Sequence, residues 1–83
     1  MKTNIKTIIK AAIASRSYTQ GAVAKKAGWK GQSALSTAIN RDNPSVETMF
    51  RILEAMEYDI IIKDRSSNTS WKLERTEEYE NNG

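Results

Sequence analysis

The sequence predicts a mainly α-helical fold in which four short helices are followed by a C-terminal β-strand or hairpin. Apolar residues recur at the three- and four-residue spacing of amphipathic helices through most of the first 57 residues. Capping residues, glycine and proline divide this pattern into four segments. The isoleucine run Ile60 to Ile62 is followed by turn-forming residues and a tryptophan, a pattern typical of two short strands.

The first two helices have clear boundaries. The first begins behind the polar residues Thr3 and Asn4 and ends near residues 15–17. Its apolar face comprises Ile5, Ile8, Ile9, Ala12 and Ile13. The second spans Gln20 to Ala27, with Thr19 as its N-cap and Gly28 as a left-handed C-terminal stop.

The next two helices are separated by a break at residues 41–44. A turn from Gly28 to Gly31 leads into the third helix, Gln32 to about Asn40. The fourth helix runs from Val46 to about Glu57 behind the N-cap Ser45. Its apolar stripe, which we expect in the core, consists of Val46, Met49, Phe50, Leu53 and Met56.

The remaining chain predicts a hairpin and a tail. Strands at Asp59 to Arg65 and Trp71 to Leu73 flank the turn-forming run Ser66 to Thr69. We therefore expect a helical domain at residues 1–58, a hairpin at 59–74, and an acidic, disordered tail at 75–83.

Charge is divided unevenly along the chain. The first 41 residues hold eight Lys or Arg and no acidic residue, whereas the rest holds five basic and all ten acidic residues. A one-sided positive field attracts phosphate-bearing partners and supplies sequence-independent affinity for nucleic acid. The first half therefore predicts contact with a polyanion.

The composition argues against an enzyme. The chain has no histidine and no cysteine, which removes the imidazole base, the Ser/His triad and thiolate zinc sites. Glu47, Glu54 and Glu57 are interpreted as solvated surface charge rather than a carboxylate site. We expect no cofactor, no metal and no membrane contact, and a cytoplasmic location.

The third helix is the best candidate for reading DNA bases. At about 100° per residue, its polar residues fall within an arc of about 140°, opposite Ala34, Leu35, Ala38 and Ile39. The expected base-reading residues are Gln32, Ser33, Ser36, Thr37 and Asn40. For Gln32 and Ser33 the alternative is helix capping, and for Ser36 and Thr37 an idle solvated face.

Several residues near this helix suit the DNA backbone. The candidates are Gln20, Lys26, Lys30, Arg41 and Asn43. Lys30 directly precedes the third helix, where the helix N-terminus also favours phosphate. For Trp29, in the same turn, we prefer gap filling between helices to contact with DNA.

Residues in the predicted helices resemble the Cro and phage-repressor (XRE-like) helix-turn-helix family. The residues that carry the resemblance are Gln20, Val23, Ala24, Gly28, Leu35, Asn40, Pro44 and Ser45, and GQSALSTAIN at residues 31–40 is similar to the recognition helix of the lambda repressor. The resemblance covers Ile5 to Tyr58 and implies a lambda-repressor-like, four-helix DNA-binding domain. It also implies that Gln20 and Gln32 cooperate at an adenine, that Ser33 and Ser36 face the groove, and that residues 40–43 lie by the sugar-phosphate backbone.

The chain departs from the family pattern at two places. Leu35 lies seven positions after Gly28 where the family usually has six, so the turn holds one extra residue and the angle of the recognition helix is open. Glu57 stands where the family commonly ends its last helix with glycine.

The hairpin predicts a dimer contact. Tyr58, Ile60 and Ile62 share one strand face and Ile61 points to the other, so a lone hairpin exposes apolar surface on both sides. Pairing its edge with a second copy buries these residues together with Trp71 and Leu73. The alternative is a hairpin folded back onto its own helices.

These observations predict a sequence-specific, double-stranded DNA-binding regulator, most simply a homodimeric repressor. The alternative is a protein-interaction module of helix-turn-helix type, either the antitoxin of a toxin-antitoxin pair or a phage inhibitor. In that case a protein partner such as a toxin binds the C-terminal strand and tail.

Overall fold

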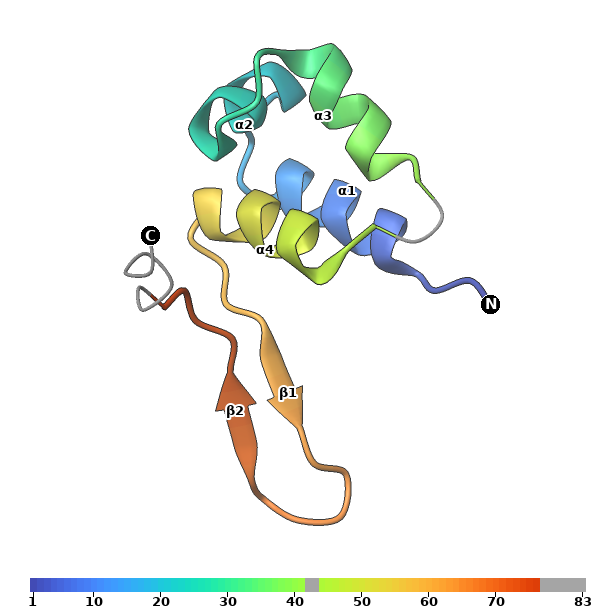
Figure 1. Ribbon diagram of the computed structural model, residues 1–83, viewed down its shortest axis with the longest axis vertical. Coiled ribbons are helices and arrows are strands. Elements are labelled where there is room, and N and C mark those ends of the chain that lie inside the picture. Colours follow the sequence, from blue (N-terminus) through green and yellow to red (C-terminus); the bar gives the residue numbers. More distant parts are fainter. Residues whose placement is uncertain (42–43, 77–83) are drawn as a thin grey trace, which may run out of the picture.

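Within residues 1–41 and 44–76, which the computed structural model describes, the chain forms four helices and a hairpin. The elements are α1 (Ile5–Ser15), α2 (Gln20–Ala27), α3 (Gln32–Ile39), α4 (Val46–Ala55), β1 (Ile61–Lys63) and β2 (Ser70–Lys72). The mainly α-helical prediction with a C-terminal hairpin is confirmed. Figure 1 shows the helices gathered at one end of the long axis and the hairpin projecting from them.

Local signals explain where α2 and α4 begin. The Thr19 hydroxyl accepts a hydrogen bond from the Ala22 amide at 3.1 Å, and the Ser45 hydroxyl accepts one from the Thr48 amide, also at 3.1 Å. Each of these bonds satisfies an amide that has no partner inside its own helix. The two predicted N-caps are therefore confirmed.

All four helices contribute to the core. α2 packs against both α3 and α4, and α4 also packs against α1. The buried residues are Ile9, Ile13, Val23, Ala24, Leu35, Ile39, Ile52, Leu53 and Met56. Tyr18, Trp29, Tyr58 and Ile60 are partly buried against this cluster. The core thus extends past the last helix to the beginning of the hairpin.

Two residues on predicted apolar faces are exposed, and one of them, Val46, we expected in the core. Val46 is 59% exposed because it begins α4, before that helix meets its neighbours. Ile8 is 45% exposed because α1 turns the stripe containing Ile9 and Ile13 toward the core and leaves Ile8 outside it. The fully buried residue that the α4 stripe missed is Ile52.

Three helices end in the same backbone motif. The residue that follows the last turn has positive φ at Ser17 (61°), Gly28 (93°) and Glu57 (66°). In each motif the amide of the next residue bonds the carbonyl five positions back, as in Tyr58 to Leu53 at 3.0 Å. This is the Schellman arrangement. Glu57 therefore occupies a backbone conformation that favours glycine.

The hairpin is antiparallel, with Ile61 opposite Lys72, Ile62 opposite Trp71, and Lys63 opposite Ser70. The ladder continues at its base, where the Leu73 amide bonds the Ile60 carbonyl at 2.9 Å. Because paired residues share a face, one face carries Ile60, Ile62, Trp71 and Leu73, and the opposite face carries Ile61 and Lys72. The first face is therefore apolar along its length.

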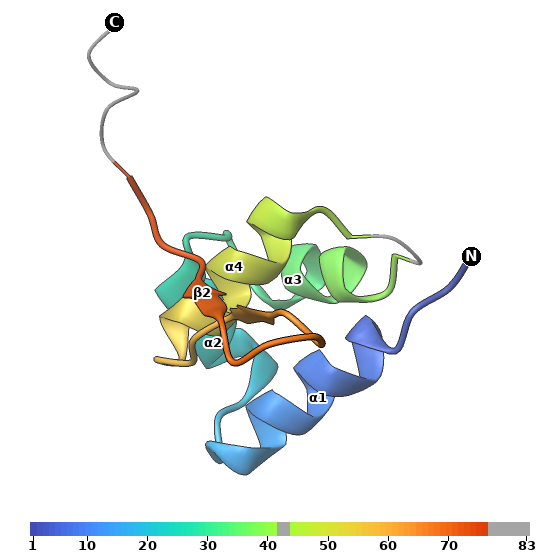
Figure 2. The same cartoon turned by 90° about the horizontal axis from the view of Figure 1, so that it is seen from below.

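Two sequence predictions about the hairpin have different outcomes. The first strand is shorter than the predicted segment Asp59 to Arg65, because the chain enters its turn after Lys63, whereas the second has the predicted length and begins one residue earlier than predicted. The hairpin does not fold back onto the helices but extends away from them, as Figure 1 shows; in Figure 2, which is seen from below, the hairpin lies in front of the helices. The predicted tail lies outside the described residues from position 77 onward.

Candidate nucleic-acid interface

The pair α2 and α3 lies at the end of the molecule opposite the hairpin (Figure 1). Gly28 ends α2 in the left-handed conformation, and Gly31 is extended where α3 begins. Since α3 packs chiefly against α2, the two helices and their turn form one exposed unit. Such a pair presents its second helix to the major groove of DNA.

The two faces of α3 differ sharply in burial. Leu35 and Ile39 are buried in the core, and Ala34 and Ala38 are half-buried beside them. On the opposite side the predicted base-reading residues are exposed at Gln32, Ser33, Thr37 and Asn40 and half-buried at Ser36. All of these polar side chains are uncharged, so this face carries no negative charge that would repel phosphate.

Hydrogen bonds on this face differ from residue to residue. The Thr37 hydroxyl donates to the Ser33 carbonyl at 3.0 Å, and the Asn40 amide donates to the Ser36 carbonyl at 2.9 Å. Both bonds run along the helix and leave acceptor atoms on the same side chains. In the described part of the chain, no side chain caps the N-terminus of α3. Neither Gln32 nor Ser33 therefore caps α3 with its side chain.

Basic side chains flank the polar face. Lys26, at the end of α2, Lys30, in the turn, and Arg41, just after α3, are all exposed. Gln20 is half-buried at the first position of α2. Asn43 lies outside the described residues. Cations on either side of a helix that carries short polar side chains provide charge for phosphates and hydrogen-bonding groups for bases.

Not every basic residue of the first half is available for a polyanion. The Arg16 side chain donates to the Met56 carbonyl at 3.0 Å and to the Glu57 carbonyl at 3.2 Å. Its guanidinium lies 4.1 Å from the centre of the Tyr58 ring. Arg16 therefore fixes the end of α4 against α1. The sequence around Arg16 does not indicate this role.

Arg51 makes a similar set of contacts at the end of α2. Its Nη2 donates to the Ala27 carbonyl at 3.0 Å, and its guanidinium lies 4.1 Å from the centre of the Trp29 ring. Trp29 packs against the core, which fits the gap-filling interpretation. Nothing in the sequence around Arg51 indicates these contacts, because a charged residue at this position is what any amphipathic helix carries on its exposed face.

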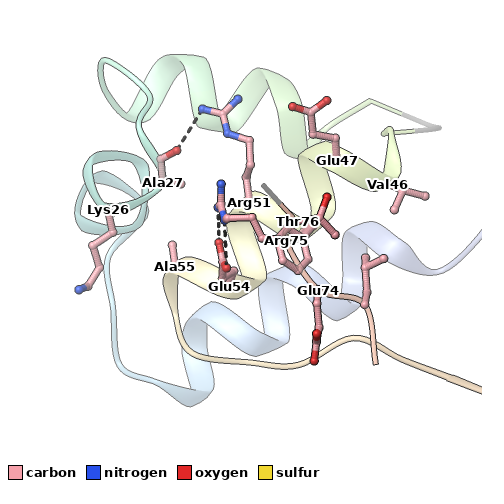
Figure 3. Close-up of a pocket in the computed structure, with 12 residues that line it drawn as sticks. Lys26, Ala27, Val46, Glu47, Arg51, Glu54, Ala55, Glu74, Arg75 and Thr76 are labelled. Carbon is pink, nitrogen blue, oxygen red and sulfur yellow. Dashed lines mark hydrogen bonds and ion pairs between the residues drawn. The ribbon is translucent and has the colours of Figure 1, made fainter. Parts of the chain in front are cut away.

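A groove of about 730 Å³ opens between α4, the end of α2 and the segment after β2. It is lined by Lys26, Ala27, Val46, Glu47, Phe50, Arg51, Glu54, Ala55, Leu73, Glu74, Arg75 and Thr76 (Figure 3). The Arg75 side chain pairs with Glu54 and lies 5.7 Å from the Phe50 ring. The hydrogen bond from Arg75, more than its charge, lowers the pKa of Glu54.

Other kinds of site are not found among residues 1–41 and 44–76. No group of three or more His, Cys, Asp or Glu side chains there is placed to hold a metal ion. No helix in the same residues is long and apolar enough to cross a membrane.

Comparison with known proteins places the chain in a family. The model of a helix-turn-helix family matches residues 9–62, which is most of the helical domain and the beginning of the hairpin. No curated protein and no solved structure matches the chain. The match covers more than half of the chain and contains the whole α2–turn–α3 unit. The chain therefore belongs to the XRE-type helix-turn-helix family of DNA-binding regulators.

Proposed function

We propose that this protein is a sequence-specific, homodimeric repressor that binds duplex DNA through α3. The observation that carries the proposal is the exposed polar face of α3, which is flanked by exposed Lys26, Lys30 and Arg41 and lies opposite the hairpin. A face of this composition suits the major groove, where small polar side chains approach base edges closely.

Base reading centres on Gln32 at the start of α3. Its side chain is exposed and does not cap the helix, so both its carbonyl oxygen and its amide group are free for a bidentate contact with adenine. Gln20 begins the neighbouring helix and supports Gln32 or contacts the backbone. Ser33, Ser36, Thr37 and Asn40 extend the readout along the groove.

Phosphate contacts position the helix. Lys30 precedes the uncapped first turn of α3, where free backbone amides also favour an anion. Lys26, Arg41 and Asn43 complete the proposed set. Each engaged cation adds about one unit to the salt dependence of binding.

The dimer forms through the hairpin. Ile62 and Trp71 are paired across the strands and are 53% and 58% exposed. Adjacent large apolar side chains with this much exposure are typical of an interaction surface. A two-stranded hairpin gains stability when a second copy covers this face. Tyr58 and Ile60 pack against the protomer's own core, so they support the base of the hairpin, and Leu73 is half-buried beside them.

Repression is steric in this proposal. Two recognition helices related by a twofold axis read half-sites separated by about 34 Å, one turn of DNA. A dimer of this kind seated on a promoter excludes polymerase and needs no cofactor.

The test is selection of duplexes from a random pool by the purified protein at near-physiological salt. An enriched inverted repeat with half-sites about one helical turn apart supports the proposal. Salt-sensitive binding to every duplex without enrichment contradicts it. That outcome redirects the search to a protein partner for the exposed hairpin, as the antitoxin and phage-inhibitor alternatives require.

A further inference from the structure

One side chain of the turn before α3, at residues 28–31, packs against the core. Gly28 has a positive φ, Lys30 is exposed, and a Cβ placed on Gly31 would meet no atom within 4 Å. Trp29, by contrast, is partly buried against the core. Where Trp29 lies therefore determines where the chain enters α3.

Trp29 is held in turn by α4 through Arg51. The guanidinium covers the indole ring at 4.1 Å while Nη2 bonds the Ala27 carbonyl at 3.0 Å. A Cβ placed on Gly28 would lie 3.3 Å from the same Nη2, so the guanidinium also lies against the turn itself. Figure 3 shows Arg51 reaching from α4 to Ala27. The Arg51 side chain thus contacts both the end of α2 and the residue of the turn that packs against the core.

The turn alone does not fix the direction of α3. α3 packs chiefly against α2, and the turn from Gly28 to Gly31 is long enough to allow α3 more than one orientation relative to α2. A planar cation stacked on an aromatic ring restricts both partners in distance and in tilt. The contacts of Arg51 therefore restrict the direction in which α3 leaves the turn.

We propose that Arg51 is a positioning residue for DNA recognition: its contacts with Ala27 and Trp29 set the angle at which α3 enters the major groove. The inference rests on the proposed DNA-binding function and adds a residue outside the helix-turn-helix unit that controls specificity. Arg51 acts through the turn and does not touch DNA. Reading bases requires placement to within about half an ångström, so a small change in this angle costs specific contacts first.

The chain contains a matched control. Arg16 makes the same kinds of contact as Arg51, with a guanidinium 4.1 Å from the Tyr58 ring and a hydrogen bond of 3.0 Å to the Met56 carbonyl. Its contacts lie at the end of α4, away from the α2–α3 turn. Replacing either arginine removes one stacked cation and its carbonyl bonds, but only Arg51 borders the turn.

The experiment compares Arg51→Gln with Arg16→Gln in the full chain, after circular dichroism has shown that both fold. For each variant the affinity is measured on the selected site and on a scrambled duplex over a range of salt concentrations. We expect Arg51→Gln to lower the ratio of specific to non-specific affinity about tenfold or more, with an unchanged salt slope. Arg16→Gln is expected to leave the ratio unchanged.

Two results would overturn the proposal. Equal weakening on both duplexes with a smaller salt slope, restored by Arg51→Lys, would make Arg51 a phosphate contact. An unchanged ratio in Arg51→Gln, or an equal fall in Arg16→Gln, would reduce the role to stability alone. Arg51→Lys keeps the charge but loses the planar stack, so we expect it to behave like Arg51→Gln.

A measurement without DNA separates this proposal from the proposed function. Amide hydrogen exchange at Trp29 and Leu35, whose amides bond the Ala24 and Gly31 carbonyls, should accelerate in Arg51→Gln and stay unchanged in Arg16→Gln. If no duplex is selected by the wild-type protein, the proposed function fails while this measurement still decides whether Arg51 orders the turn. Unchanged exchange in Arg51→Gln would overturn the inference by itself.

Discussion

Ser17, Gly28 and Glu57 share a left-handed backbone conformation, yet only one of them is glycine. A residue with a Cβ at such a position costs roughly 1 kcal/mol. An aromatic residue follows each position, namely Tyr18, Trp29 and Tyr58, and all three are packed against the core. The burial of these rings offsets the backbone cost and explains how the sequence tolerates serine and glutamate there.

Glycine at position 57 should stabilise the fold. Glu57→Gly removes the left-handed penalty while keeping the carbonyl that accepts from Arg16, and we expect about 0.5–1 kcal/mol more free energy of unfolding in urea titrations. Gly28→Ala should do the opposite by at least about 1 kcal/mol, because its Cβ also meets the Arg51 side chain at 3.3 Å. A neutral or destabilising Glu57→Gly would mean that the glutamate side chain has a stabilising contact of its own.

Gln32 is the residue on which base reading can be tested most directly. Gln32→Ala should lower affinity for the selected site by about 1–3 kcal/mol and leave helicity unchanged, since the side chain does not cap α3. Lys30→Ala serves as the comparison and should weaken binding to all duplexes alike, with a salt slope smaller by about one. Unchanged specific affinity in Gln32→Ala would remove this residue from the base-reading set.

The Glu54–Arg75 pair should contribute stability that depends on pH. The hydrogen bond from Arg75 lowers the pKa of Glu54, so the contribution is complete above the ordinary carboxyl range and is lost as the pH falls through the lowered pKa. Both side chains are largely in solvent, which limits the effect to about 0.5 kcal/mol. Thermal unfolding of Glu54→Gln and wild type should differ slightly at pH 7 and converge at a pH below the lowered pKa of Glu54. A difference that persists there would point to packing.

At the scale of elements, α4 connects the parts of the molecule. It supplies Ile52 and Leu53 to the core, followed by Met56 at its C-cap, and its Arg51 side chain reaches the α2–α3 turn. At the C-terminus of α4, the Met56 carbonyl accepts a hydrogen bond from Arg16, the residue that follows α1. The helix that contacts no DNA in our proposal thus holds both the beginning of the domain and its recognition unit.

The helices could be predicted from the sequence because their signals are local. Thr19 and Ser45 cap their helices by bonds within three residues, and Gly28 ends α2 through its own backbone freedom. Helical periodicity also separated the two faces of α3 correctly. Local patterns are enough wherever the interaction that decides the structure lies within one helical turn.

Long-range placement could not be predicted in the same way. Ile8 and Val46 fit apolar stripes but lie where no neighbouring element covers them. Arg16 and Arg51 look like surface cations, and their carbonyl partners are 40 and 24 residues away in the chain. The roles assigned to the residues of the DNA-binding face stay predictions, since periodicity and burial show which side chains are available and not what they contact.

At the scale of the whole molecule, the proposed recognition helix and the proposed dimer contact are separated along the long axis. α3 lies at one end and the turn of the hairpin at the other (Figure 1). In a twofold dimer joined through the hairpins, an axis running along them places both recognition helices at the same end. The acidic residues of the hairpin, Asp59 and Asp64, then lie away from DNA.

The oligomeric state tests this arrangement. Ile62→Ser should shift the protein toward monomer in sedimentation experiments and weaken operator binding, because it removes an apolar side chain from the Ile62–Trp71 face. Ile61→Ser is the matched control on the opposite face beside Lys72, and it should leave the dimer intact. Dissociation by both substitutions would favour pairing along the strand edge, and a persisting dimer in both would move the interface to the helices.

The contacts of Tyr58 also affect how the protein is made. The Tyr58 hydroxyl bonds the Ala12 carbonyl at 3.0 Å across 46 positions of sequence, and Arg16 stacks on the same ring. A nascent chain that has emerged only as far as α4 therefore lacks the residues that close the domain on α1. Since chains begin to fold during synthesis from the N-terminus, the helical domain completes these contacts only once the segment that leads into the hairpin has emerged. Closure of the helical domain is thus coupled in time to the emergence of that segment.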